Sequence, residues 1–232
     1  MKIGIIGAMQ MEVDNLKEAL QNQQITTISG VEFVSGTIGN IEVVAAVSGV
    51  GKVFAAICTE AMILHFAPDC VINIGVAGSL TRDLSVLDIA VAKAVCQHDM
   101  DTSPIGDPVG LLSGINEILL PADQELVELL CSCIKEEGIN YRKGIIASGD
   151  QFIARDEQRD FIRDHFEAIA AEMEGGSIGH VCYVNKVPFA VLRAISDSEG
   201  AEMDYQTFAE RAAERSIDVI LKAIAKLDSC NS

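Results

Sequence analysis

The chain opens with Lys2-Ile-Gly-Ile-Ile-Gly7, a short apolar run that ends in glycine and leads into residues 9–21. Within that second segment, four apolar residues recur at the spacing of one helix face: Met9, Val13, Leu16 and Leu20. The order predicts a buried strand, a turn and a helix over Met9–Gln21.

Beyond this first unit, strand and helix patterns continue to the end of the chain. Strands are expected over Ile25–Ser29, Val31–Ile38, Ile41–Ser48, Cys70–Gly75, Val86–Cys96, Lys143–Ala147 and Val187–Ile195. Helices are expected over Lys52–Phe66, Asp123–Gly138, Asp156–Phe166, Glu174–Asn185 and Tyr205–Leu227. Gly39-Asn40 predicts an early hairpin turn. Together these patterns predict a three-layer α/β/α sandwich around a mixed central sheet, with residues 1–232 forming a single domain.

One long segment, Gln97–Pro121, has little periodic apolar sequence and holds three glycines and three prolines. A loop of this length without regular structure is commonly functional or mobile. We therefore expect it to take part in function.

The composition limits the classes of partner. Apolar residues make up 49% of the chain, aromatic residues only 5%, and tryptophan is absent, as expected for a sheet buried on both faces. A formal net charge of -17 disfavours binding to nucleic acid or to an anionic membrane surface. The first apolar run is too short for a signal peptide and no later run is long enough to cross a bilayer, so a cytoplasmic location is expected.

The cysteines and histidines do not form a recognisable metal site. Seven cysteines are scattered, and Cys131-Ser-Cys133 lacks the two-residue spacer and second ligand pair of a zinc site. We interpret them as reduced, mainly structural thiols. The four histidines stand in unrelated contexts, where packing is the commoner role. Neither a metal nor a cofactor is expected.

Ser48-Gly-Val-Gly-Lys52 is similar to two phosphate-binding motifs but matches neither. A nucleotide-binding P-loop would need glycine where Ala46 stands and a hydroxyl where Val53 stands. A dinucleotide fingerprint would need glycine in place of Phe54. The two glycines instead suggest close approach of the backbone to a ligand or a neighbouring strand.

Three acidic residues, Glu12, Glu174 and Asp197, stand where open α/β sheets usually form ligand crevices: Glu12 and Asp197 after predicted strands, and Glu174 beside a predicted helix start. Each also has a structural explanation. Glu12 could answer a helix dipole, and Asp197 could be a helix cap or turn residue. In Glu172-Met-Glu174, one carboxylate could cap the following helix while the other points into a cleft.

Six strings in order carry a resemblance to a known family: Gly7-Ala-Met-Gln-Met-Glu12, Ser48-Gly-Val-Gly-Lys52, Asn73-Ile-Gly-Val-Ala-Gly78, Ser148-Gly-Asp-Gln-Phe152, Ala171-Glu-Met-Glu174 and Arg193-Ala-Ile-Ser-Asp197. They resemble the motifs of bacterial 5'-methylthioadenosine/S-adenosylhomocysteine nucleosidases, within the purine nucleoside phosphorylase superfamily. The resemblance implies a purine nucleoside phosphorylase-like fold and hydrolysis of the bond between adenine and a 5'-thio-substituted ribose.

The same resemblance implies roles at the reacting centre. Glu12 is similar to the base that activates water, and Asp197 to the acid at N7 of adenine. Glu174 resembles the residue that holds the ribose 2'- and 3'-hydroxyl groups, with Met173 beneath the sugar and Arg193 orienting the Glu174 carboxylate. An acid helps because adenine that is protonated at N7 leaves as a neutral molecule rather than as an anion. A base helps because it takes the proton of the water that captures the oxocarbenium-like sugar.

Further positions are implied around the substrate. Phe152 resembles the ring that stacks on adenine, Ile153 the residue whose backbone reads the base edge, and Ala77 and Gly78 part of the same binding site. The apolar pocket for the 5'-thio group is implied at Met9, Val50 and Phe208. The family also implies a homodimer, in which the loop after His98 reaches the neighbouring active site.

The sequence departs from the family pattern at two places. Val76 stands where many members have serine, and Ser79 where the next glycine is expected. In the loop after His98, Thr102 and Ile105 replace a more aromatic sequence at the expected pocket positions. The resemblance therefore bears more directly on adenine release than on thioether specificity.

Three alternatives remain to be weighed. A phosphorylase would need a cation for phosphate, yet residues 7–12 contain an acid and no Lys or Arg. A nucleosidase for another purine nucleoside, such as futalosine, would keep the acids and change the 5' pocket. A silent nucleoside-binding protein would require neither a water-activating base nor a protonated acid.

Overall fold

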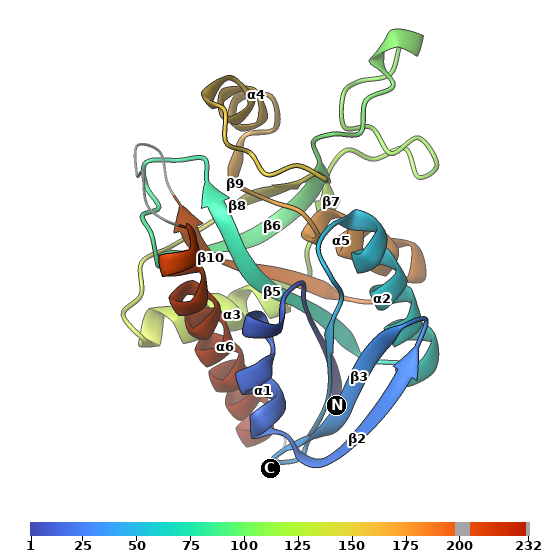
Figure 1. The fold of residues 1–232 in the computed structure, drawn as a ribbon, viewed down its shortest axis with the longest axis vertical. Coiled ribbons are helices and arrows are strands. Elements are labelled where there is room, and N and C mark those ends of the chain that lie inside the picture. Colours follow the sequence, from blue (N-terminus) through green and yellow to red (C-terminus); the bar gives the residue numbers. More distant parts are fainter. Residues whose placement is uncertain (198–204, 231–232) are drawn as a thin grey trace.

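The computed structural model describes residues 1–197 and 205–230, leaving aside the side chains of residues 205–207 and 230. Its strands are β1 (Lys2–Gly7), β2 (Gln21–Ile28), β3 (Val31–Ile38), β4 (Ile41–Val47), β5 (Cys70–Ser79), β6 (Ile89–Gln97), β7 (Leu120–Pro121), β8 (Tyr141–Ser148), β9 (Ala168–Glu172) and β10 (Phe189–Asp197). Its helices are α1 (Asp14–Ala19), α2 (Lys52–Phe66), α3 (Gln124–Glu136), α4 (Asp156–Phe166), α5 (Gly175–Asn185) and α6 (Tyr205–Cys230), with two short 3-10 turns, η1 (Gln10–Glu12) and η2 (Ser103–Ile105) (Figure 1).

The strands form one mixed sheet, as predicted. β4, β1, β5 and β10 run parallel to one another, while β2 and β3 add an antiparallel hairpin at one side. β6 and β8 are parallel to each other, and β6 is antiparallel to β10. The four parallel strands therefore end at the same edge of the sheet, which is where an α/β protein forms its ligand crevice.

One part of the sheet closes on itself. β5 pairs with β10, β10 with β6, β6 with β8, β8 with β9, and β9 returns to β5. The last contact is short and joins Gly78 to Ala171 and Ser79 to Ala170. These five strands thus form a barrel-like ring beside the open hairpin side, and the ends of β5, β9 and β10 are brought together.

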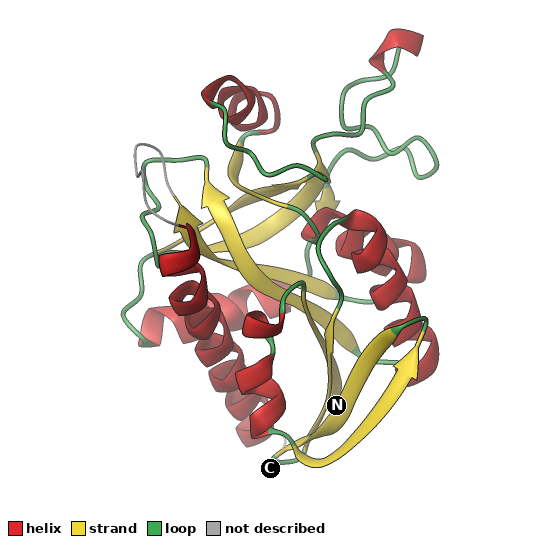
Figure 2. Ribbon diagram, in the orientation of Figure 1, coloured by secondary structure: helices red, strands yellow, loops and turns green. Residues whose placement is uncertain are grey.

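Helices cover both faces of the sheet (Figure 2). α1, α3 and α6 pack on one face, and α2 and α5 lie side by side on the other. Along β1, Ile3 and Ile5 belong to the hydrophobic cluster beneath α3 and α6, whereas Ile6 belongs to the cluster beneath α2 and α5. Since side chains alternate along a strand, apolar residues at every position mark a strand buried on both faces. The low aromatic content is explained by this layered aliphatic core.

Two local predictions need correction. The predicted helix Met9–Gln21 is divided into η1 and α1, and Gln21 already belongs to β2. The division occurs because the Glu12 carboxylate accepts hydrogen bonds from the amides of Ala8 and Met9, which folds the chain into a tight turn. The short strand β9 was not predicted at all.

The described cysteines agree with reduced, structural thiols. Six of them, Cys58, Cys70, Cys96, Cys131, Cys133 and Cys182, are free and buried. Burial raises the pKa of the Cys58 and Cys96 thiols to about 12. Such thiols are poor nucleophiles at neutral pH. Among the described helices, none is both long and apolar enough to cross a membrane.

Candidate active site

A cavity opens at the edge where the parallel strands end. The empty space within it, counted together with the open solvent at its mouth, is about 650 Å³. It is lined by Ala8, Met9, Glu12, Val50, Val76, Ala77, Gly78, Leu80, Gln151, Phe152, Ile153, Arg159, Ala171, Glu172, Met173, Glu174, Ser196 and Asp197. The lining combines apolar walls with four carboxylates, which is unusual for a cavity that merely fills space.

Glu12 is held at the floor of the cavity by backbone amides. One carboxylate oxygen accepts hydrogen bonds from Ala8 at 2.7 Å and Met9 at 2.9 Å, and the other accepts from Val76 at 3.1 Å. Burial raises the pKa of Glu12 above its ordinary value, although the Arg193 charge and these amides oppose that shift. A fixed carboxylate with a raised pKa is suited to accept a proton near neutral pH.

Gly75 brings the backbone of β5 close to this carboxylate. A Cβ atom at position 75 would lie 2.6 Å from Glu12 Oε1, which is too close for two non-bonded atoms. The glycine thus permits the next residue, Val76, to donate its amide to Glu12. The departure from serine at position 76 leaves this backbone donor in place.

Glu172 and Glu174 take different roles at the start of α5. The Glu172 carboxylate accepts hydrogen bonds from the amides of Glu174 at 3.0 Å and Gly175 at 2.7 Å, and so caps the helix. Glu174 lines the cavity, where its Oε1 accepts a hydrogen bond from the amide of Gly51 at 2.9 Å. Of the two predicted arrangements, Glu172 is the capping residue and Glu174 the residue that faces the cleft.

Arg193 lies behind these carboxylates. Its side chain is 1% exposed and pairs directly with Glu172, while Glu174 Oε2 is 3.8 Å away. Arg193 also donates to the side-chain oxygen of Asn73. It therefore touches Glu172 more closely than Glu174, the residue that the family resemblance assigned to it.

The two neighbouring glutamates have opposite pKa shifts. Burial alone would raise the pKa of Glu172, but the Arg193 guanidinium and hydrogen bonds from Ser148 and the α5 amides hold it below its ordinary value. Burial, followed by the charge of Glu172, raises the pKa of Glu174 to about 7. Glu172 is thus ionised at neutral pH, whereas Glu174 can change its protonation state in that range.

Asp197 lines the same cavity and stands at the end of β10. Its Oδ1 accepts a hydrogen bond from the Ser196 hydroxyl at 2.9 Å, and its Oδ2 lies 3.9 Å from Arg159 of α4. Arg159 also donates to the carbonyl of Ser79. Asp197 is therefore connected to α4 and to the end of β5, rather than acting only as a turn residue.

The apolar walls come from three loops. Met9 and Val50 follow β1 and β4, and Phe152 and Ile153 follow β8. Phe152 is 61% exposed at the cavity, so its ring offers a face on which a planar base could stack. The glycines beside Val50 have positive φ angles, and the amides of Gly49 and Gly51 bond to Ala8 and Glu174. Both therefore serve close backbone approach, as predicted.

Most of the residues predicted from sequence converge on this cavity, with two exceptions. Arg193 is buried behind it, and Phe208 lies half-buried on α6 outside its lining. Four polar residues of the lining were not predicted as site residues: Arg159, Gln151, Glu172 and Ser196. Arg159 in particular stands within a helix whose sequence gives no signal that one of its side chains reaches β5. Among the described residues, no group of three His, Cys, Asp or Glu side chains could hold a metal ion.

Comparison with known proteins identifies the family. The model described as the phosphorylase superfamily matches residues 2–225. A 5'-methylthioadenosine/S-adenosylhomocysteine nucleosidase of Aeromonas salmonicida is 38% identical, with 98% of this chain and all of that protein covered. The protein of that name from Staphylococcus carnosus is 39% identical, with 97% and 100% covered. The chain belongs to this nucleosidase family.

Solved structures of the nucleosidase family share the fold. A Helicobacter pylori enzyme, crystallised as a mutant with 5'-methylthioadenosine in its active site, is 36% identical with a TM-score of 0.92 over 97% of this chain and 98% of its own. A Neisseria meningitidis nucleosidase in complex with methylthio-immucillin-A is 33% identical, also with a TM-score of 0.92, covering 97% and 99%. A further Helicobacter pylori structure, 36% identical over 98% of this chain and 98% of its own with a TM-score of 0.92, is named futalosine hydrolase. The predicted fold and family are confirmed.

Proposed function

We propose that this nucleosidase hydrolyses the N-glycosidic bond of 5'-methylthioadenosine and S-adenosylhomocysteine, releasing adenine and the 5'-thio-substituted ribose. The observation that carries the proposal is the convergence of Glu12, Glu174 and Asp197 on one cavity with an exposed aromatic ring. The names of the relatives support the choice of substrate.

The first half of the reaction takes place at the base. Asp197, in its protonated form, transfers its proton to N7 of adenine, so that the base departs neutral as the bond between C1' and N9 breaks. Phe152 and Ile153 hold the purine between an aromatic face and backbone groups. The bonding electrons remain on adenine, and C1' acquires oxocarbenium character.

The second half takes place at the sugar. Glu12 takes a proton from water while the water oxygen bonds to C1', which gives the free thioribose. Glu174 accepts hydrogen bonds from the ribose hydroxyl groups, and Met173 packs beneath the ring. The carboxylates also stabilise the positive charge that develops on the sugar. Solvent then returns a proton to Asp197 and removes the proton from Glu12.

The charges around the cavity favour water over phosphate as the nucleophile. Among the described residues that line the cavity, the positively charged side chain is that of Arg159. It lies beside Asp197 and donates a hydrogen bond to the Ser79 carbonyl. Glu12, by contrast, stands among backbone amides without a cation in hydrogen-bond contact. A phosphate dianion at that place would be repelled by Glu12 and Glu174.

The decisive experiment is chromatographic detection of free adenine after incubation with 5'-methylthioadenosine and EDTA, with and without phosphate. We expect equal release of adenine and methylthioribose in both buffers. Turnover that requires phosphate and yields a sugar 1-phosphate would contradict hydrolysis and the role of Glu12. If neither buffer supports turnover, the nucleosidase acts on another nucleoside or only binds.

A second candidate substrate class is that of futalosine, because a structural neighbour carries the name futalosine hydrolase. Thr102 of this chain bonds to Asp107 within its own loop, and neither Thr102 nor Ile105 lines the cavity described above. The described lining of the cavity therefore contains neither of these two loop residues. Relative values of kcat/KM for the three nucleosides decide between the candidates.

We also propose a homodimer in which the loop after His98 completes the neighbouring site. The loop extends away from the body of the molecule (Figure 1), and Ile105 within it is 83% exposed. Exposed apolar side chains gather on the adjacent helices α2 and α5: Val53, Phe54, Ile57, Leu64, Tyr183 and Val184. Such a concentration is typical of a protein interface.

Sedimentation tests the dimer. Val53→Glu on α2 is expected to shift the particle toward the monomer mass, whereas Ile25→Glu, an exposed apolar residue on β2, is expected to leave it unchanged. A wild-type protein that sediments only as a monomer would contradict this assembly.

We further propose that residues 1–232 act as one domain, located in the cytoplasm, where buried reduced thiols such as those found here are usual.

A further inference from the structure

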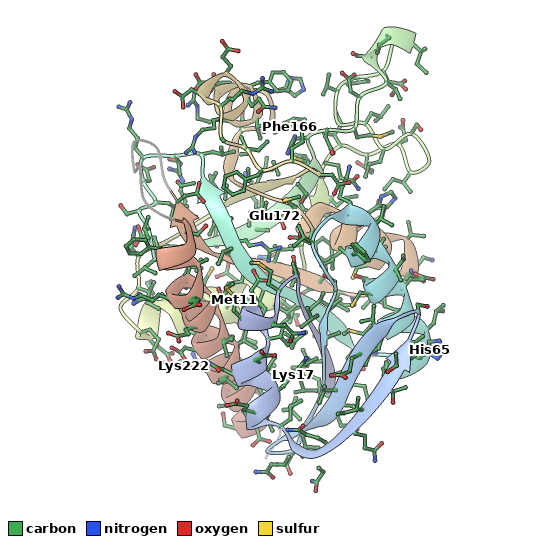
Figure 3. All side chains as sticks on the ribbon, viewed as in Figure 1. Met11, Lys17, His65, Phe166, Glu172 and Lys222 are labelled. Carbon is green, nitrogen blue, oxygen red and sulfur yellow. The ribbon has the colours of Figure 1, made fainter. Side chains whose placement is uncertain are left out.

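Glu172 is the most completely engaged carboxylate in the described structure. It accepts hydrogen bonds from the Ser148 hydroxyl, from Arg193, and from the amides of Glu174 and Gly175. Its side chain is 1% exposed, and Figure 3 shows it in the middle of the molecule. Ser148 and Glu172 end β8 and β9 and Arg193 lies in the middle of β10, so one carboxylate connects three strands to the start of α5.

The partner of Glu172 is a buried cation that cannot lose its charge. Arg193 is 1% exposed, and a guanidinium stays protonated in proteins. A buried charge needs a counter-charge in contact with it. Glu172 fills that requirement directly, and the side-chain oxygen of Asn73 accepts a second hydrogen bond from Arg193.

The next carboxylate in line is the one that faces the substrate. Glu174 Oε2 lies 3.8 Å from Arg193, just beyond a hydrogen bond, and is held there by the Gly51 amide on its other oxygen. If Glu172 were uncharged, attraction to Arg193 would draw Glu174 into a direct ion pair. That movement would withdraw Glu174 from the cavity.

We propose that Glu172 is a positioning residue, which occupies Arg193 and thereby leaves the Glu174 carboxylate to accept hydrogen bonds from the hydroxyl groups of the ribose. The inference rests on the proposed function, since it concerns the sugar contact of the same site. Glu172 acts through Glu174 in two ways: it holds the Arg193 charge, and it binds the backbone amide of Glu174 itself.

Discrimination between hydroxyl and deoxy substrates measures this role. The quantity is the ratio of kcat/KM for 5'-methylthioadenosine to that for its 3'-deoxy analogue, at pH 8, where Glu174 is ionised in the wild type. The intrinsic reactivity of each nucleoside is the same for every variant, so it cancels when ratios are compared. A hydrogen bond to a charged group corresponds to a wild-type preference of roughly 10- to 100-fold.

The variants separate positioning from simple structural support. In Glu172→Gln we expect the ratio to fall about tenfold or more relative to the wild type, down to the intrinsic ratio of the two nucleosides. Ser148→Ala removes a hydrogen bond to the same carboxylate but leaves its charge, so its ratio is expected to stay at the wild-type value. The double variant Glu172→Gln/Arg193→Met removes both charges and is expected to recover the ratio.

Each outcome has a definite meaning. If Glu172→Gln loses activity equally on both nucleosides and keeps the wild-type ratio, Glu172 is structural only and the inference is overturned. If Glu172→Gln does not fold, the double variant decides, since replacing both members of a buried ion pair is tolerated better than breaking it; a lost ratio there overturns the inference. A wild type that does not cleave 5'-methylthioadenosine overturns the proposed function first, whereas cleavage without preference for the hydroxyl overturns only the assignment of Glu174 and Glu172.

Discussion

The amide of Gly51 donates a hydrogen bond of 2.9 Å to the carboxylate of Glu174, although 123 residues separate the two in the chain. Gly51 precedes α2 and Glu174 precedes α5, so the starts of the two helices meet at the cavity. The bond fixes Glu174 in a buried position where its charge is costly. The stability of the nucleosidase should therefore depend on whether Glu174 is ionised.

Glu174→Gln is expected to stabilise the protein at alkaline pH. The pKa of Glu174 is raised from 4.5 to about 7 in the folded protein. The stability of the fold is therefore fully present below pH 4.5, where Glu174 is protonated in both states, and part of it is lost as the pH rises through 7. The ionised group then costs of the order of 3 kcal/mol. At pH 8 the variant should melt several degrees above the wild type, and the difference should shrink near pH 5. A difference that does not depend on pH would contradict the raised pKa.

Asp99→Asn is expected to show the opposite dependence. Asp99 is paired with Lys52 at 2.6 Å and accepts from the amide of Asp150, and although burial opposes it, these contacts lower the pKa of Asp99. The contribution of Asp99 to the free energy of unfolding is therefore present above the pKa that Asp99 has in the unfolded chain, and it is lost as the pH falls through the lower pKa of the folded state. We expect a loss of roughly 1–3 kcal/mol at pH 7, measured by urea unfolding and diminishing below pH 4. Asp218→Asn, an exposed site on α6, is the control and should change little.

Glu12→Gln and Asp197→Asn are expected to lower kcat by roughly 10²- to 10⁴-fold each, since a base or an acid is removed without a change of shape. Both variants should keep their far-ultraviolet circular dichroism spectrum and should still bind adenine, which is measurable by calorimetry. Unimpaired adenine release by either variant would remove that residue from the mechanism.

Gly75→Ala is expected to reduce kcat by roughly 100-fold, the effect of displacing a reacting group by about 1 Å. The added Cβ would stand 2.6 Å from Glu12 Oε1, so the carboxylate must shift. Gly114→Ala is the matched control, because its Cβ would meet open space. Equal activity of the two variants would show that the position of Glu12 is not critical.

The sequence was sufficient for most of the sheet because strand signals are local, whereas most of the cavity residues were implied by the family resemblance. Apolar runs such as Lys2–Gly7 and Cys70–Gly75 correspond to β1 and to the first part of β5, and the residues after them line the cavity. β9, by contrast, is Ala-rich and only five residues long, so it has neither length nor periodicity to distinguish it.

Long-range pairings were the part that the sequence could not supply. Glu172 and Arg193 belong to family-like strings, but nothing in those strings shows that they contact each other rather than Arg193 contacting Glu174. Arg159 reaches the Ser79 carbonyl across 80 residues, and Phe208 falls outside the described cavity despite its family-like position. Such contacts depend on how α4 and α6 pack on the sheet, which is a tertiary effect.

The ring of β5, β10, β6, β8 and β9 also determines the order in which the protein can mature during synthesis. Of the strands in the described residues, β10 is the last to leave the ribosome, yet it lies between β5 and β6, which are made more than 90 residues earlier. Until β10 emerges, both neighbours present unpaired edges, the kind of surface that promotes association between chains. Asp197 and Arg193 arrive on that same strand. The nascent nucleosidase is therefore most exposed to association with other chains just before its candidate active site can form. Pairing of β10 with β5 and β6 covers the two strand edges and brings Arg193 and Asp197 to the site in the same step.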